Sequence, residues 1–193
     1  MERELISDQD KKVFDEYVES LNLSLEDFNK DILDVGSGFS EFAKYARENN
    51  ISSSVFSLDP IRKMEETEKS VKGIVEKLPF RDESFDLIIS HCAIPNIFIG
   101  EDLRKIEASF LEMMRVLKKN GEIRLGNVLK GDIYPNQRDF VLNLNQTLDK
   151  LKEEFNVEIE ERLIPNRVNY EYLKDGSKRG LSKSYFVKIK KIA

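Results

Sequence analysis

Residues 31–40, Asp-Ile-Leu-Asp-Val-Gly-Ser-Gly-Phe-Ser, decide the fold of this 193-residue chain. A short apolar run from Ile32 to Val35 contains an acidic residue near its end, and a glycine turn follows at once. The residues from Glu41 onward have the composition of a helix, so the pattern predicts a strand, a glycine loop and a helix. Such a unit binds nucleotide-like ligands, because glycines expose bare backbone and the helix begins with free N–H groups.

The spacing of the glycines separates the possible ligands. A dinucleotide fingerprint has glycine at the first, third and sixth loop positions, which here hold Gly36, Gly38 and Glu41. The third glycine allows close packing of helix on strand, so Glu41 argues against NAD. The phosphate-binding loop ending in Gly-Lys-Ser/Thr is also absent. An acidic residue followed by Gly-x-Gly remains, a pattern that an ordinary strand-to-helix turn can also show.

The composition indicates a soluble globular protein of one domain. The chain is 40% hydrophobic and 35% charged, with a formal net charge of −5. This charge disfavours non-specific nucleic-acid binding, which depends on neutralising phosphates. The single cysteine, Cys92, excludes an intrachain disulfide and a multi-cysteine zinc site. The N-terminus lacks the order of a secretory signal and no apolar run has transmembrane length, so we expect a cytoplasmic protein.

The charges are unevenly distributed along the chain. Residues 1–34 hold eleven acidic and four basic side chains, whereas residues 174–191 hold seven basic and one acidic. The basic segment is either the solvated surface of a C-terminal hairpin or a patch for an anionic substrate.

Helix-like and strand-like hydrophobic periods alternate along the sequence, which favours an α/β sheet with helices on both faces. The expected helices cover residues 10–21, 41–49, 61–69, 103–117 and 137–155. The expected strands cover residues 32–35, 54–59, 73–75, 85–90, 122–128, 157–163 and 184–189. The last two strands can pair antiparallel at a sheet edge.

Three segments, in this order, resemble the class I S-adenosylmethionine-dependent methyltransferases of the small-molecule type. The first is the acidic-x-Gly-x-Gly turn at 34–38. Residues 76–90 resemble the family signature of Leu-Pro-Phe, an acidic turn, Ser-Phe-Asp and an apolar strand. Residues 114–123 resemble its Arg-Val-Leu-Lys-Pro-Gly-Gly stretch, with Lys119 and Asn120 where Pro-Gly is usual. The resemblance runs from about residue 30 to residue 128.

The resemblance implies a Rossmann-like three-layer α/β/α sandwich, with a seven-stranded, mostly parallel sheet and an antiparallel C-terminal hairpin. Residues 1–193 would form a single methyltransferase domain. Within it, 1–29 would be a helical cover, 30–128 the cofactor-binding core, and 129–193 the C-terminal helix and hairpin. We expect a monomer or a homodimer and no association with membranes.

The resemblance also implies how S-adenosylmethionine binds. Asp34 would hold the amino-acid end, and Gly36 and Gly38 would let backbone reach the methionine and ribose parts. Asp59, 23 residues after Gly36, would bind the ribose hydroxyls, although it can also be a helix cap beside Pro60. The full predicted set is Asp34, Gly36, Ser37, Gly38, Asp59, Pro60, Val75, Glu76 and Ser90.

One position departs from the family pattern. The family often has Asp after the third-strand glycine, where it accepts a hydrogen bond from the adenine amino group, and here Ile74 stands there. The adenine would then be held by backbone at Val75 and by apolar contact, with Glu76 compensating. Losing a charge-assisted bond of roughly 1.5–3 kcal/mol weakens binding tenfold or more.

The acceptor should lie near residues 90–96, just past the fourth strand. His91, the only histidine, is the candidate general base, with a structural role as the alternative. The Asn/Asp-Pro-Pro-aromatic motif of DNA and amino-group methylation is absent there, so we expect a small-molecule acceptor. Phe98, with Tyr134, Tyr170 and Tyr172, could line its pocket. The alternatives are an RNA or protein methyltransferase that uses the basic C-terminal loop, and a non-catalytic member of the fold.

Overall fold

The computed structural model describes residues 8–60, 68–130, 135–172 and 178–193. Seven strands form one sheet in the order β3-β2-β1-β4-β5-β7-β6. They are β1 (Ile32–Val35), β2 (Val55–Asp59), β3 (Ser70–Lys72), β4 (Phe85–His91), β5 (Leu117–Lys130), β6 (Val157–Tyr172) and β7 (Lys178–Lys191). Strands β1 to β5 pair in parallel, and β7 runs antiparallel to both β5 and β6. The predicted mostly parallel sheet with an antiparallel hairpin is confirmed.

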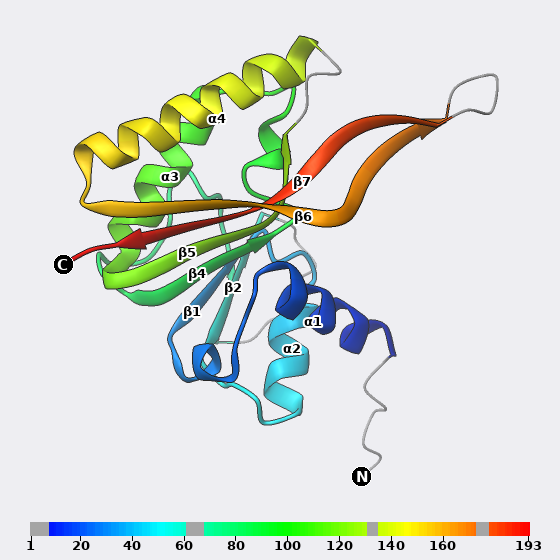
Figure 1. Ribbon diagram of the computed structural model, residues 1–193. Helices are drawn as coiled ribbons and strands as arrows, with labels where there is room; N and C mark the ends of the chain where they lie inside the picture. The colour runs from blue at the N-terminus through cyan, green and yellow to red at the C-terminus, as the bar shows by residue number, and fades with distance from the viewer. Residues whose placement is uncertain (1–7, 61–67, 131–134, 173–177) are drawn as a thin grey trace.

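Helices cover both faces of the sheet. Figure 1 shows α1 (Asp8–Ser20) and α2 (Glu41–Glu48) on one side, and α3 (Arg104–Val116) and α4 (Pro135–Glu154) on the other. Two short 3-10 helices, η1 (Leu25–Asn29) and η2 (Asn96–Phe98), lie in the connections. This arrangement confirms the predicted three-layer sandwich.

The strands separate two hydrophobic clusters because successive side chains point to opposite faces. In β1, Leu33 and Val35 belong to the cluster under α3 and α4, whereas Ile32 packs with the aromatic residues of α1 and α2. All four residues of β1 are buried, as expected for a central parallel strand with both faces covered.

The third strand lies earlier than the sequence predicted. Residues 73–75 were expected to form it, but β3 is Ser70–Lys72, a short edge strand that pairs with β2. The apolar character of Ile74 and Val75 reflects their place in the loop that follows, where Val75 is buried. Of the helix predicted over 61–69, residues 61–67 lie outside the described ranges, and Glu68 and Lys69 form a turn.

A buried ionic network ties the N-terminal region to the sheet. Arg124 of β5, only 8% exposed, lies 2.9 Å from Oδ2 of Asp27 in η1 and 2.7 Å from Oε2 of Glu122. Nη1 of Arg124 also donates to the carbonyl oxygen of Asn22 at 3.0 Å. Burial raises the pKa of Asp27, but hydrogen bonds from Lys30, the Ser24 backbone and Arg124 together hold that pKa well below its usual range.

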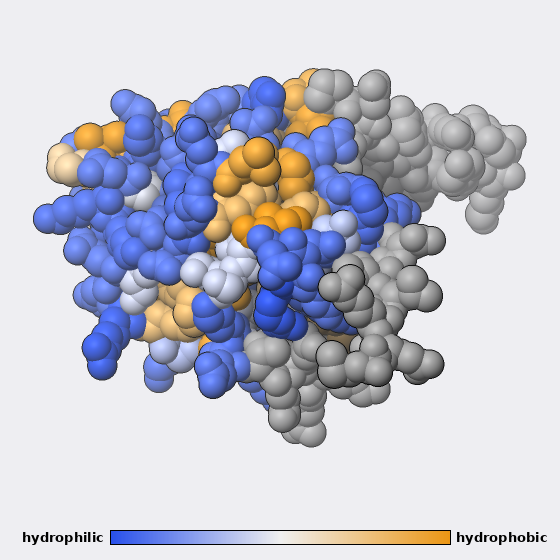
Figure 2. Space-filling view, turned by 90° about the horizontal axis from the view of Figure 1, so that it is seen from below, coloured by the Kyte–Doolittle hydropathy of each residue, from blue (hydrophilic) through white to orange (hydrophobic). Residues whose placement is uncertain are grey.

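The described residues include no helix with both the length and the apolar composition needed to cross a bilayer. On the face shown in Figure 2, a hydrophobic patch lies near the centre, and smaller hydrophobic areas are scattered among hydrophilic residues elsewhere.

Candidate functional site

The glycine turn after β1 has a backbone shape that only these residues allow. Gly36 has φ +75°, and a Cβ placed there would lie 2.3 Å from Cβ of Ala93, the residue two positions past β4. Gly38 also has a positive φ, +59°, but its Cβ would meet open space, with Oε2 of Glu41 nearest at 3.9 Å. The turn therefore needs glycine at 36 for both conformation and space.

The backbone N–H groups of this turn already have acceptors. Those of Gly36 and Ser37 donate to the carbonyl oxygen of Leu58, at 2.8 and 3.2 Å. The Gly38 N–H donates to Oδ2 of Asp59 at 3.0 Å. A phosphate would need these donors for itself. The turn therefore suits a ligand without phosphate, such as an adenosyl sulfonium.

Asp34 at the end of β1 is the most unusual polar group of the site. It is 0% exposed, and the hydroxyl of Tyr17 donates to its Oδ1 at 3.4 Å. Within the described part of the chain, no donor reaches Oδ2. Burial raises the pKa of Asp34 well above its usual range; the carboxylates of Asp59 and Glu41 add to this, and the Tyr17 hydrogen bond opposes it. A buried acceptor of this kind is ready for a donor or a cation from a ligand.

An apolar pocket of about 200 Å³ opens beside the turn. Its described lining comes from the ends of β1 and β2, the loop after β3, and the region around η2: Val35, Gly36, Leu58, Pro60, Gly73, Ile74, Val75, Glu76, Ile94, Ile97, Phe98, Glu101 and Lys105. Ile74, at the position where the family has Asp, is 52% exposed and contributes only apolar surface. The pocket suits a flat aromatic ring such as adenine.

The residues at this site fit S-adenosylmethionine. The unpartnered oxygen of Asp34 matches an ammonium group, and the bare backbone of Gly36 leaves room for the chain that follows. Asp59 is buried at the end of β2, in the position for a diol. Four residues of the predicted set line the apolar pocket beside the turn: Gly36, Pro60, Val75 and Glu76.

Ser90 lies behind this pocket and connects two strand ends. Its hydroxyl donates to the carbonyl oxygen of Val35 at 2.8 Å and accepts the Ile94 N–H at 2.9 Å. These bonds hold the loop after β4 against the glycine turn, so direct binding of cofactor by Ser90 stays a prediction.

On the acceptor side, His91 contacts residues from two other elements. Its Nε2 lies 2.8 Å from Nδ2 of Asn127 in β5 and 3.5 Å from Sγ of Cys92. Its ring packs against that of Tyr17, with centroids 4.6 Å apart. Which of the two side chains donates in the contact with Asn127 depends on the tautomer of the imidazole. A role for His91 as a base stays a prediction.

Sequence reasoning missed Tyr17 and Asn127. Tyr17 lies in the helix predicted over residues 10–21, at a helical spacing from Phe14 and Leu21 that indicates core packing for its ring and says nothing of its hydroxyl. Asn127 could have been found, because it is a polar residue near the carboxyl end of a parallel strand, where ligands of such sheets bind. Both Cys92 and Asn127 also have positive φ, 58° in each case. Of the aromatic candidates, Phe98 is in the pocket lining, whereas Tyr134 and the side chains of Tyr170 and Tyr172 lie outside what the structure describes.

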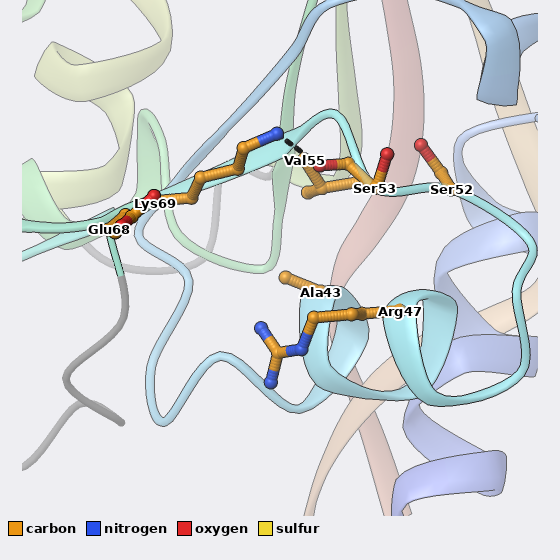
Figure 3. Close-up of a pocket in the computed structure, with 7 residues that line it drawn as sticks. All are labelled: Ala43, Arg47, Ser52, Ser53, Val55, Glu68 and Lys69. Atoms are coloured by element: carbon orange, nitrogen blue, oxygen red, sulfur yellow. Dashed lines mark hydrogen bonds between the residues drawn. The ribbon is translucent and has the colours of Figure 1, made fainter.

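A larger hollow of about 420 Å³ lies at the opposite end of the sheet, where β2 and β3 begin. Figure 3 shows its lining, with Lys69 hydrogen-bonded to the carbonyl oxygen of Ser53: Ala43, Arg47, Ser52, Ser53, Val55, Glu68 and Lys69. Open α/β sheets bind ligands at the carboxyl ends of their strands. We therefore assign the site to the smaller pocket. The described residues contain no group of three or more His, Cys, Asp or Glu side chains placed to hold a metal ion.

Comparison with known proteins agrees with this geometry. Residues 33–125 match the model of a family described as a methyltransferase domain. This match and the order of the sheet together support a class I S-adenosylmethionine-dependent methyltransferase. More particularly, the match to the methyltransferase domain family covers just under half of the chain, and it indicates S-adenosylmethionine as the cofactor.

Solved structures share the fold at low sequence identity. YcgJ from Bacillus subtilis is 18% identical with a TM-score of 0.59, covering 91% of this chain and 99% of that one. A putative methyltransferase from Bacillus halodurans is 16% identical with a TM-score of 0.59, covering 94% and 100%. A chain from the complex of the Haloferax volcanii Trm112 activator with a putative methyltransferase is 15% identical with a TM-score of 0.60, covering 96% and 93%. No curated protein matches the sequence.

Proposed function

We propose that this protein transfers a methyl group from S-adenosylmethionine to a small-molecule acceptor. The observation that carries the proposal is the buried oxygen of Asp34 without a partner, at the strand end that also holds the glycine turn and the apolar pocket. When bound, the cofactor supplies an electrophilic methyl group on a sulfonium.

Each residue has a distinct part in this proposal. Asp34 holds the ammonium group of the amino-acid end, and the turn at Gly36 gives it room. Asp59 accepts hydrogen bonds from the ribose hydroxyls with the carboxylate that already orients Gly38. Pro60 and Ile74 enclose the adenine between apolar surfaces.

The acceptor binds next to His91, where the methyl group would lie. For His91 to take a proton at Nε2, the Asn127 amide must first release that nitrogen, 2.8 Å away. The acidic side chains that act on Tyr17 beside it are Asp34 and Glu41. Such surroundings favour a neutral or cationic acceptor over a phosphate-rich one.

Calorimetry with S-adenosylhomocysteine tests the cofactor site. We expect Asp59→Ala to weaken binding at least tenfold, because hydrogen bonds to a charged group are worth roughly 1.5–3 kcal/mol. Asp102→Ala, which removes an exposed acid paired with Arg104, should bind like the wild type. No binding to the wild type would refute the proposal, and equal binding by Asp59→Ala would refute the ribose assignment.

The nature of the acceptor needs a separate experiment. Incubation with methyl-labelled cofactor and a fractionated cell extract should place the label in the small-molecule fraction. Label in RNA or protein would favour the macromolecular alternative. In that case Lys178→Ala/Arg179→Ala should reduce salt-sensitive binding. The side chains of these two residues, and the whole of Lys174, lie outside the described part of the structure.

A further inference from the structure

One side chain contacts both halves of the proposed site. The Tyr17 hydroxyl lies 3.4 Å from Oδ1 of Asp34, and the Tyr17 ring lies 4.6 Å, centroid to centroid, from that of His91. Asp34 belongs to the cofactor side, at the end of β1. His91 belongs to the acceptor side, at the end of β4. Tyr17 itself comes from α1, outside the sheet.

The bond between Tyr17 and Asp34 is long in this structure. A hydroxyl donor normally lies about 2.7–2.8 Å from its acceptor, and closer still when the acceptor is ionised. Burial of the carboxyl group favours its neutral form, as argued above. A cation that pairs with Oδ2 would ionise Asp34 and make it a stronger acceptor for the Tyr17 hydroxyl.

Because the hydroxyl is attached to a rigid ring, a shorter bond to Asp34 would move the whole Tyr17 ring against its packed neighbours. Tyr17 is 5% exposed and stacks on Phe42 of α2 with centroids 4.6 Å apart and planes 13° apart. The His91 ring lies against it at an interplanar angle of 56°. Motion of the hydroxyl toward Asp34 therefore shifts the surface on which the imidazole rests.

The imidazole would register that shift through its own hydrogen bond. Its Nε2 lies 2.8 Å from Nδ2 of Asn127, which is 5% exposed and fixed at the end of the neighbouring strand. A displaced ring changes this bond, and with it the proton arrangement of His91.

We infer that Tyr17 is a positioning residue that transmits the arrival of the cofactor's amino-acid end at Asp34 to His91 on the acceptor side. This inference rests on the proposed function, because it takes S-adenosylmethionine as the ligand of Asp34. It adds a route through Tyr17 by which the amino-acid end of the cofactor acts on the acceptor side, beside the direct approach of the methyl group.

His91 is the only histidine in the chain, so its ring signals in a ¹H–¹⁵N NMR spectrum of the full-length protein need no assignment. S-adenosylhomocysteine should displace these signals in the wild type, with the dissociation constant that calorimetry gives. Tyr17→Phe should still bind, about tenfold more weakly or less, while its His91 signals keep their positions. Phe14→Leu is the matched control: Phe14 lies on the same helix and stacks on the same Phe42 at 5.2 Å, and this variant should respond like the wild type.

A second ligand tests the inference without any substitution. 5′-Methylthioadenosine has the adenosine and the methylated sulfur but lacks the amino-acid end, so it should bind the wild type and displace the His91 signals less than S-adenosylhomocysteine does. Equal displacement by both ligands, or equal displacement in the wild type and Tyr17→Phe, would overturn the inference. Absence of calorimetric binding by the wild type would refute the proposed function, and the inference with it.

Discussion

The guanidinium of Arg115 donates to the carbonyl oxygen of Phe80 at 2.9 Å. It thereby joins the two sequence segments that most resemble the methyltransferase family, the Leu-Pro-Phe turn and the Arg-Val-Leu stretch. Arg115 also donates to the carbonyl oxygen of Leu78 at 3.1 Å and pairs with Glu112 and Asp82 at 2.8 and 2.7 Å. The turn that follows the pocket-lining residues 73–76 is therefore anchored to α3.

Arg115→Lys should destabilise the protein by about 1–3 kcal/mol, because one ammonium cannot replace the fork that binds two carbonyls and two carboxylates. Urea denaturation measures the change. Arg104→Lys provides the control, since Arg104 is highly exposed and pairs with Asp102 at the surface; its effect should stay within about 0.5 kcal/mol. Equal losses in the two variants would contradict this account of Arg115.

Gly36→Ala should lower the free energy of unfolding by roughly 2–5 kcal/mol, because strain in a left-handed backbone adds to a clash with Ala93. Gly38→Ala adds only the backbone part, about 1–2 kcal/mol, because its side chain would point into open space. The double variant Gly36→Ala/Ala93→Gly should relieve the steric clash but keep the strain of the left-handed backbone. The same denaturation experiment checks all three, and a Gly36→Ala variant as stable as Gly38→Ala would speak against the packing argument.

Asp34→Asn should stabilise the protein in the absence of cofactor and abolish cofactor binding. Because burial raises the pKa of Asp34 in the folded state, its ionisation weakens folding progressively as the pH rises above about 4. The free energy of unfolding of the variant should therefore exceed that of the wild type by an amount that increases with pH, up to about 1–3 kcal/mol. Thermal unfolding between pH 4 and 8, with calorimetry on the same samples, measures both effects. A variant less stable than the wild type at pH 8 would show that Asp34 has a structural partner.

Asp27→Asn should destabilise the protein by about 3 kcal/mol at pH 7, because Arg124 would lose a buried partner. The pKa of Asp27 is lowered from 3.8 in the folded protein, so its contribution is complete above about pH 4 and is lost as the pH falls further. The difference from the wild type should shrink between pH 4 and pH 2. Asp15→Asn removes one partner of an exposed ion pair with Lys11, and its stability should differ little from the wild type at any pH. A stability difference between Asp27→Asn and the wild type that is constant with pH would refute the lowered pKa of Asp27.

The mostly parallel sheet, its antiparallel hairpin and the closeness of several candidate site residues could be predicted from the sequence, because they follow from local patterns. The carboxyl ends of parallel strands lie at one edge, so the spacing of Asp34, Gly36 and Asp59 was enough to bring them together. Tyr17 could not be placed in this way, since the direction of its hydroxyl depends on how α1 packs across the sheet. The edge strand β3 was misplaced because Ser-Val-Lys is weaker in strand character than the apolar residues after it.

The positive φ angles of Cys92 and Asn127 have a consequence for anyone who engineers this protein. Both residues hold a conformation that glycine adopts at lower cost. Selection for heat resistance alone would therefore favour glycine at the two positions that surround the imidazole. A thermostable descendant obtained in this way would keep its shape while losing the two side chains that contact His91, the Asn127 amide and the Cys92 thiol.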